Sequence, residues 1–180
     1  MLVDADQLRR TVARIAHEIV ERHGDPGGVA LVGIHTRGVP LAARLARLIG
    51  EFTGERPVLG SLDIALYRDD VGMAGARRRA VPVVGVTELD YDVTERVAVL
   101  VDDVIFTGRT IRAAIDALLD YGRPPAVQLA VLVDRGHREL PIRPDYVGKN
   151  LPTSRTERVN VRLTEVDGVD EIVLEEGVAE

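Results

Sequence analysis

The sequence contains no cysteine, and no apolar run in it comes near the roughly 18 residues that a membrane helix needs. The first absence excludes disulfide bonds and thiolate metal sites. The second indicates a protein without a membrane partner. Residues 1–6 also lack a basic region followed by an apolar run, which is the pattern of a signal peptide. We therefore expect a cytoplasmic protein.

Positive charge is almost entirely arginine, because Lys149 is the only lysine. The formal net charge is −6 over 180 residues, which argues against general coating of nucleic acid but leaves room for a local basic patch. A compositional bias of the source genome explains the scarcity of lysine better than thermostability does. The length and an apolar share of 46% predict one domain over residues 1–180 with a single core.

Short apolar runs alternate with amphipathic helical segments along the chain. Such runs are typical of strands that are buried on both faces of a parallel sheet. Asp4 is the expected cap of the first helix, with Gln7 at the capping-box position. The alternation predicts an α/β fold whose central, mostly parallel sheet is flanked by helices. Helices are predicted at residues 4–22, 39–49 and 109–121, the last with Gly122 as its C-terminal cap, and strands at 29–34, 58–66, 96–101, 128–133, 146–147, 159–163 and 172–174.

Segment 101–110 reads Val-Asp-Asp-Val-Ile-Phe-Thr-Gly-Arg-Thr and joins an apolar strand to a helix through an expected loop at 102–108. A helix N-terminus offers N–H groups and partial positive charge, so it favours a phosphate monoester. Gly108 allows close approach of the backbone, while Thr107, Thr110 and Arg109 add donors. An ordinary helix cap explains only part of this segment. The chain has no Walker lysine motif.

Two adjacent acids, Asp102 and Asp103, precede this phosphate site. Two carboxylates beside a phosphate would repel it, so they need another binding partner. Carboxylates accept hydrogen bonds from sugar hydroxyls, or hold Mg²⁺ directly or through water. A phosphate on the loop and a ribose diol on the acids together describe a ribose 5-phosphate.

Segment 101–110 resembles the motif that binds 5-phosphoribosyl 1-pyrophosphate (PRPP) in type I phosphoribosyltransferases. The resemblance implies that fold, with a small hood and a flexible loop, and a Mg²⁺-dependent transfer from PRPP to a nitrogen nucleophile. It implies catalytic roles for Arg37, Asp102 and Asp103, with the two aspartates also serving the Mg²⁺. The implied PRPP or nucleotide site comprises Thr36, Arg37, Arg78, Asp102, Asp103, Val104, Ile105, Phe106, Thr107, Gly108, Arg109 and Thr110.

Two further segments fit that resemblance. Residues 33–38 lie between a strand and a helix and resemble the family's pyrophosphate loop, in which Arg37 holds the leaving diphosphate. Taken alone, they fit a plain turn with a solvated arginine. Residues 68–82 lie where the family carries its flexible loop. Arg77, Arg78 and Arg79 are candidates there for diphosphate contact or, equally, for a solvated charge cluster.

The residue at position 106 bears on the identity of the acceptor base. In the 6-oxopurine members of the family the matching position is an aspartate that serves purine N7, whereas this chain has Phe106. The apolar side chain favours a pyrimidine or another acceptor. Neutral drift at a loop position is the alternative.

Residues 129–154, together with 14–19 and 66–70, resemble the PyrR family, and the resemblance extends over residues 7–173. It implies uracil phosphoribosyltransferase activity, which makes UMP and diphosphate from uracil and PRPP. It also implies regulation of pyrimidine genes, in which the protein binds leader mRNA and attenuates transcription when UMP or UTP is bound. Positions linked to RNA contact are His137, Arg138, Arg143 and Lys149. His17 matches a family position that is linked to regulation. The alternative is that it is an ordinary helix histidine on a packed or solvated face.

The base site is expected under the hood that the type I fold places over the sugar C1′ carbon. Main-chain groups there are expected to read the uracil edge, while Tyr146 or an apolar neighbour packs on its face. The family also implies a homodimer or a higher homo-oligomer. Two other functions stay open, namely a phosphoribosyltransferase for another base and a nucleotide sensor without catalysis. The predicted base-binding residues are Asp134, Arg135, Tyr146, Val147 and Val159.

Overall fold

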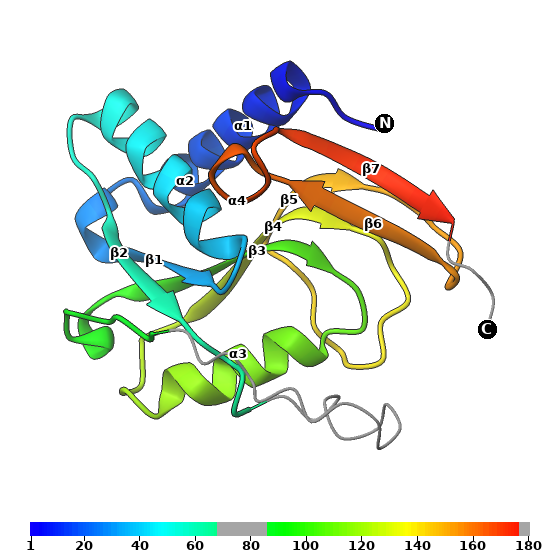
Figure 1. Ribbon diagram of the computed structural model, residues 1–180. Helices are drawn as coiled ribbons and strands as arrows, with labels where there is room; N and C mark the ends of the chain where they lie inside the picture. Colours follow the sequence, from blue (N-terminus) through cyan, green and yellow to red (C-terminus); the bar gives the residue numbers. More distant parts are fainter. Residues whose placement is uncertain (68–85, 177–180) are drawn as a thin grey trace.

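The computed structural model describes residues 1–67 and 86–176 and contains a five-stranded parallel sheet (Figure 1). The strand order is β2-β1-β3-β4-β5, with neighbouring strands parallel throughout. This confirms the predicted α/β class. Within the described ranges, no helix has the length and apolar character to cross a membrane. The strands are β1 (Val29–Ile34), β2 (Val58–Leu62), β3 (Val97–Ile105), β4 (Val127–Asp134) and β5 (Tyr146–Asn150).

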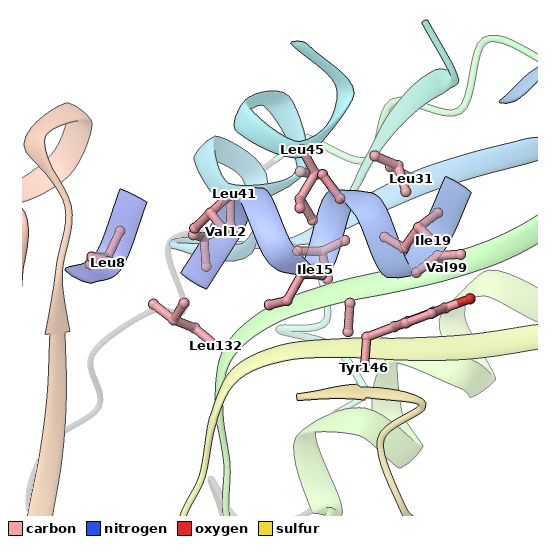
Figure 2. Close-up of a cluster of buried hydrophobic side chains, with 14 of the residues drawn as sticks. Leu8, Val12, Ile15, Ile19, Leu31, Leu41, Leu45, Val99, Leu132 and Tyr146 are labelled. Atoms are coloured by element: carbon pink, nitrogen blue, oxygen red, sulfur yellow. The ribbon is translucent and has the colours of Figure 1, made fainter. Parts of the chain in front are cut away.

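Helices cover both faces of the sheet, as Figure 1 shows. On one face, α1 (Ala5–His23) and α2 (Gly38–Thr53) share a core with alternate residues of β1, β3 and β4. On the other face, α3 (Arg109–Leu119) forms a second core with the intervening strand residues. Figure 2 shows Ile15 and Leu45 in the first core together with Val99 and Leu132. The two cores explain why the central strands read as continuous apolar runs. Short 3-10 helices lie at η1 (Pro26–Gly28) and η3 (Val93–Glu95).

The capping box predicted for the first helix is present. The Gln7 N–H donates to Asp4 Oδ1 at 2.8 Å, and the Asp4 N–H donates to Gln7 Oε1 at 3.3 Å. The helix ends at Gly24, which has a φ of 70° that favours glycine. Helix α2 extends beyond the predicted end at residue 49, because a second glycine in the left-handed region, Gly54, stops it only after Thr53.

Helix α2 lies unusually close to the sheet because of two glycines. A Cβ atom on Gly38 would lie 2.1 Å from the carbonyl oxygen of Val101, and one on Gly33 would lie 2.5 Å from Cα of Val39. Any larger residue at either position therefore forces the helix away from the sheet. This close approach brings the loop that follows β1 against β3, just before Asp102.

Strand β3 continues further than predicted, and this corrects the expected loop at 102–108. Asp102, Val104 and Ile105 still pair with Val131, Val133 and Asp134 of β4. The ladder continues because β4 is long enough to supply partners after the apolar run of β3 has ended. Asp102 and Asp103 thus belong to the last part of strand β3. Only Phe106, Thr107 and Gly108 form the loop before α3.

Two other predicted boundaries are also wrong. Strand β2 stops at Leu62, not residue 66, because the chain turns there and the Tyr67 N–H donates to the Ile64 carbonyl at 2.9 Å. Helix α3 ends at Leu119 with Asp120 as its cap, so Gly122 does not cap it. A Cβ atom on Gly122 would lie 2.5 Å from Cγ2 of Val93, so this glycine permits a close approach of the chain to η3.

A small hood follows the main sheet. It consists of the antiparallel strands β6 (Glu157–Arg162) and β7 (Glu171–Glu176), with the short helix α4 (Thr164–Asp167) between them. Figure 1 shows the hood on the side toward which β3, β4 and β5 point. Arg44 of α2 anchors it through paired hydrogen bonds to Glu165 and Asp170, at distances from 2.6 to 2.9 Å. The hood expected from the type I fold is therefore present.

Candidate functional site

The carboxyl ends of the parallel strands bring the predicted phosphate segment and the predicted diphosphate loop to one edge of the sheet. In open α/β sheets, ligands bind at this edge. Arg37 follows β1, while Asp102 and Asp103 lie near the end of β3 and Thr107 just beyond it. Residues from separate parts of the sequence thus converge here, as predicted.

The phosphate segment lines a cavity of about 360 Å³. Gly108 is the N-cap of α3 and has a φ of 91°, a conformation that glycine adopts without strain. The Thr107 carbonyl accepts hydrogen bonds from the Glu139 and Leu140 N–H groups at 2.9 and 3.1 Å, so the loop after β4 fixes this segment. The N-terminus of α3 opens into the cavity, which suits an anion. The lining residues are Val104, Ile105, Phe106, Thr107, Gly108, Arg109, Thr110, Ile111 and Glu139.

The two acids at the end of β3 are held by main-chain hydrogen bonds. Asp102 is only 7% exposed, and its Oδ1 accepts the Asp103 N–H at 2.9 Å. Oδ1 of Asp103 accepts the Val104 N–H at 2.8 Å. Burial raises the pKa of the Asp103 carboxyl, although a hydrogen bond with Asp102 and the charge of Arg37 oppose that rise. The pair is rigid and able to accept hydrogen bonds from a diol.

The same acids are the residues that fit Mg²⁺. Among the described residues, no group of three or more histidines, cysteines or acids gathers as a metal site. Mg²⁺ commonly binds one or two protein carboxylates together with substrate phosphates, rather than an all-protein cage. Asp102 and Asp103 match that donor set, because they are adjacent carboxylates beside a phosphate cavity.

Arg37, the predicted diphosphate ligand, lies in the loop after β1. A cis peptide bond joins His35 to Thr36 immediately before it, and Thr36 is exposed. The Arg37 guanidinium donates from Nε to Oδ2 of Asp167 at 3.1 Å, and from Nη2 to Oδ1 at 2.7 Å. The hydrogen bonds to Asp167 raise the pKa of Arg37, and Asp103 adds to the rise. Arg37 therefore links the diphosphate loop to the hood.

Phe106 lies between two side chains of the loop that follows β4. The guanidinium carbon of Arg135 is 4.1 Å from the centroid of its ring, and the ring of His137 meets it edge-on at 5.8 Å. Arg135 is buried, and it donates to Thr153 Oγ1 at 3.1 Å and to the Ser154 carbonyl at 2.9 Å. Position 106 thus supplies an aromatic surface next to the phosphate segment.

The four residues predicted to contact RNA fall into two groups. Arg138 donates to the carbonyls of Ile142 and Phe106 at 2.9 and 2.8 Å, and to the Asp134 carboxylate at 2.6 Å. The His137 ring is likewise bonded to the main chain. These two residues are used to hold the loop. Arg143 and Lys149 are exposed, and Lys149 shares a surface hollow with two arginines of α1, Arg10 and Arg14.

Three of the five predicted base-binding residues lie away from the carboxyl end of β4, where the other two are. Tyr146 begins β5, is 3% exposed, and donates from its hydroxyl to Oε1 of Gln128 at 2.8 Å. Val147 is the next residue of that strand, and Val159 lies in the core next to α1 and α2. Tyr146 and Val147 lie at the start of β5, whose carboxyl end is Asn150. Asp134 ends β4 at the site, and Arg135 follows it directly.

The structure adds residues that the sequence did not indicate. Asp63 follows β2 at the same edge, and its Oδ2 is buried without a hydrogen-bond partner in the described part of the chain. The sequence feature that could have indicated Asp63 is an acidic residue at the end of an apolar strand, as at Asp102. Glu139 binds Arg109 Nε at 2.8 Å, and Asp167 binds Arg37. Arg78, with the rest of the segment predicted as a flexible loop, lies outside the described residues.

Comparisons with known proteins agree with this geometry. The model of the phosphoribosyl transferase domain family matches residues 1–165. A bifunctional protein PyrR of Chloroflexus aurantiacus is 58% identical over 99% of this chain and 96% of its own length. One from Thermus thermophilus is 58% identical over 96% of this chain and 93% of its own length.

Solved structures match in fold. The hypoxanthine phosphoribosyltransferase of Trypanosoma cruzi superimposes with a TM-score of 0.73 and covers 99% of this chain and 97% of its own. It is 16% identical in sequence, so the likeness concerns the fold alone. Family model, relatives and fold all agree with the type I fold. The chain therefore belongs to the phosphoribosyl transferase domain family and, within it, to the PyrR family of bifunctional proteins.

Proposed function

We propose that the chain, folded as one domain, transfers the phosphoribosyl group of PRPP to uracil, giving UMP and diphosphate. The observation that carries this proposal is the 360 Å³ cavity at the N-terminus of α3, with Asp102 and Asp103 beside it. The 5-phosphate binds the backbone N–H groups and hydroxyls of residues 107–110. The two aspartates accept hydrogen bonds from the ribose hydroxyls and stabilise the positive charge that develops on the sugar ring.

The leaving diphosphate binds the loop after β1, where Arg37 supplies a permanent positive charge beside Thr36. Asp102 and Asp103 would hold Mg²⁺ together with PRPP, and the metal would supply the positive charge that makes diphosphate a better leaving group. Arg37 stabilises the same charge as the C1′–O bond breaks, and it is held in place before that charge appears. Arg78 is proposed to contact diphosphate as well.

Uracil enters beside Phe106 and Arg135. The aromatic surface at position 106 offers apolar contact to a planar base, and no carboxylate there serves a purine N7. Main-chain groups at Asp134 and Arg135 are the proposed readers of the uracil edge. Uracil N1 attacks C1′ from the face opposite the diphosphate, so the configuration at C1′ inverts.

We also propose that the nucleotide-bound protein binds the leader RNA of pyrimidine genes. Arg143 and Lys149 are exposed cations that are able to pair with RNA phosphates. His137 and Arg138 belong to the loop that also holds the phosphate segment, so UMP or UTP in that segment bears on the same loop. A homodimer or higher oligomer is proposed to present these surfaces together.

A panel of bases tests the enzymatic proposal. Uracil, hypoxanthine, guanine and orotate are each incubated with PRPP and Mg²⁺, and nucleotide products are separated by chromatography. We expect UMP from uracil and no product from either purine. Product from hypoxanthine without product from uracil rejects the proposal, and PRPP binding without any turnover favours a sensor.

A gel shift with the leader RNA of the pyrimidine genes, with and without UMP, tests the regulatory proposal. We expect binding that UMP strengthens. Absence of UMP-dependent binding reduces the protein to an enzyme.

A further inference from the structure

One carboxylate of the hood binds the diphosphate loop directly. Asp167, at the end of α4, accepts both hydrogen bonds of the Arg37 guanidinium described above, at 2.7 and 3.1 Å. The two bonds run side by side from Nε and Nη2, which fixes the plane of the guanidinium as well as its position. No role in the sequence-based prediction was given to this aspartate, which is 130 residues away from Arg37.

Asp167 is itself held in place. Its Oδ2 accepts the Leu163 N–H at 2.9 Å, and its own N–H donates to the Leu163 carbonyl at 2.6 Å. The carboxylate is thus part of the turn that forms α4. Arg37 lowers the pKa of Asp167, so the group is ionised at neutral pH. A charged and rigid partner is what an arginine side chain needs in order to lose its rotational freedom before a ligand arrives.

The hydrogen bonds to Asp167 raise the pKa of Arg37, and the negative charge of Asp103 adds to that rise. The guanidinium thus contacts the hood and lies within reach of the charge of the acids at the end of β3. The bonds to Asp167 use the Nε and Nη2 donors, and the guanidinium carries further N–H donors on Nη1. That edge has no hydrogen bond to Asp167 and is the one that suits an anionic oxygen.

From these contacts we infer that Asp167 is a positioning residue for the reaction, which orients the Arg37 guanidinium for binding of the diphosphate group of PRPP. This inference rests on the proposed function. Asp167 does not touch the substrate and acts only through Arg37. The contact between Asp167 and Arg37 makes the hood part of the diphosphate site, although the hood follows the rest of the fold in the sequence.

The competing explanation is that Asp167 merely attaches the hood to α2. The chain offers a matched control for that explanation, because Arg44 attaches the same turn to the same helix. Arg44 binds Glu165 at 2.6 and 2.8 Å, and this pair does not involve Arg37. Asp167→Asn and Glu165→Gln each remove one carboxylate charge from one Arg–carboxylate pair of the hood. The two variants differ in one respect, because Asp167 binds Arg37 of the diphosphate loop whereas Glu165 binds Arg44.

The experiment measures binding of inorganic diphosphate with Mg²⁺, of PRPP and of UMP by calorimetry, and the steady-state kinetics with uracil. For Asp167→Asn we expect diphosphate and PRPP affinity to fall about tenfold, an effect typical of a lost orienting partner. The KM for PRPP should rise while the KM for uracil stays within about twofold. UMP affinity should also stay within about twofold, because UMP carries no diphosphate. Glu165→Gln should leave all these values unchanged while it lowers the melting temperature.

A double variant completes the test. In an Arg37→Gln background, Asp167→Asn should add no further loss of diphosphate affinity, because the residue acts only through Arg37. The inference is overturned if Glu165→Gln weakens diphosphate binding as much as Asp167→Asn does, or if Asp167→Asn leaves it unchanged or strengthens it. A wild-type protein that binds PRPP but does not use uracil rejects the proposed function alone, since the diphosphate measurements still apply.

Discussion

The guanidinium carbon of Arg135 lies 4.1 Å above the ring of Phe106, and the proposed uracil site lies beside this stack. Arg135 is 7% exposed, and burial lowers the pKa of its guanidinium. Two hydrogen bonds to Thr153 and Ser154 offset the loss of water around the charge. The stack therefore depends on a planar group that donates in several directions, which lysine does not offer.

Arg135→Lys should accordingly weaken the site, although it keeps the charge. We expect a loss of about 1–2 kcal/mol in the free energy of unfolding, because the stack and at least one hydrogen bond disappear. The KM for uracil should rise more than the KM for PRPP. Urea unfolding and steady-state kinetics measure these effects. Arg155→Lys, at an exposed arginine nearby, is the control and should be silent in both. A silent Arg135→Lys would show that the stack is dispensable.

Gly108 tests the phosphate segment. Its φ of 91° costs an alanine about 1–2 kcal/mol, while a Cβ there would meet nothing closer than 3.5 Å. Gly108→Ala should therefore fold, with a distorted N-terminus of α3 and affinity for UMP lowered about tenfold. Gly24→Ala is a matched control with a φ of 70° and open space around it, remote from the site. Calorimetry should show normal UMP binding for the control. Equal losses in both variants would contradict a local role.

Local patterns in the sequence predicted more of the site than distant ones. The capping box of Asp4 and Gln7 is set by neighbours in the chain and appears as expected. The start of the helix at Arg109 is also local and appears as expected, although the strand before it continues to Ile105. The placement of Tyr146 depended on the register of β5 against β4, in which it pairs with Ala130 rather than with the end of the strand. Nothing in the composition of β5 specifies that register, because its start is apolar on both faces.

Dependence on distant parts of the chain also explains why the contact of Asp167 with Arg37 was not predicted. Its turn resembles any short acidic loop, and only the packing of the hood on α2 brings it to Arg37. The extra length of β3 is a related case. Its last residues are polar, so their hydrogen bonds are determined by the partner strand and not by their own pattern.

Asp103 gives the activity a characteristic pH dependence. Burial raises the pKa of its carboxyl above the ordinary value of 3.8, so on acidification it takes up a proton earlier than an exposed aspartate does. The charged form is the better acceptor for ribose hydroxyls. We therefore expect kcat/KM for PRPP to fall on its acid side at a pH above 3.8, and Asp103→Asn to lower kcat/KM and remove this dependence.

The stability effect of Asp103 has the opposite sign. A raised pKa means that the folded state binds the proton more tightly than the unfolded state does. The contribution of Asp103 to the free energy of unfolding therefore decreases as the pH rises from 3.8 through the raised value. Asp103→Asn should be more stable than the wild type at neutral pH, although less active. A variant that is less stable at pH 7 would show that the Asp103 charge is compensated in the folded protein.

Variants of Arg138 and Arg143 distinguish a residue that supports the loop from a residue that contacts RNA directly. Arg138→Gln removes the partner of the half-buried Asp134 carboxylate and a bond to the Phe106 carbonyl, at a cost of about 2 kcal/mol in stability. It should weaken RNA binding and also raise the KM for PRPP, because the same loop holds Thr107. Arg143→Gln should weaken RNA binding through a lost phosphate pairing.

The salt dependence of RNA binding distinguishes the two variants. Loss of a phosphate contact reduces the slope of log K against log salt concentration by about 1, whereas a change of loop shape lowers affinity with little change of slope. We expect the reduced slope for Arg143→Gln and an unchanged slope for Arg138→Gln, measured by filter binding at several salt concentrations with saturating UMP. A reduced slope for Arg138→Gln with normal PRPP kinetics would assign Arg138 to the RNA instead, and its hydrogen bonds to Phe106 and Asp134 would then have to break on binding.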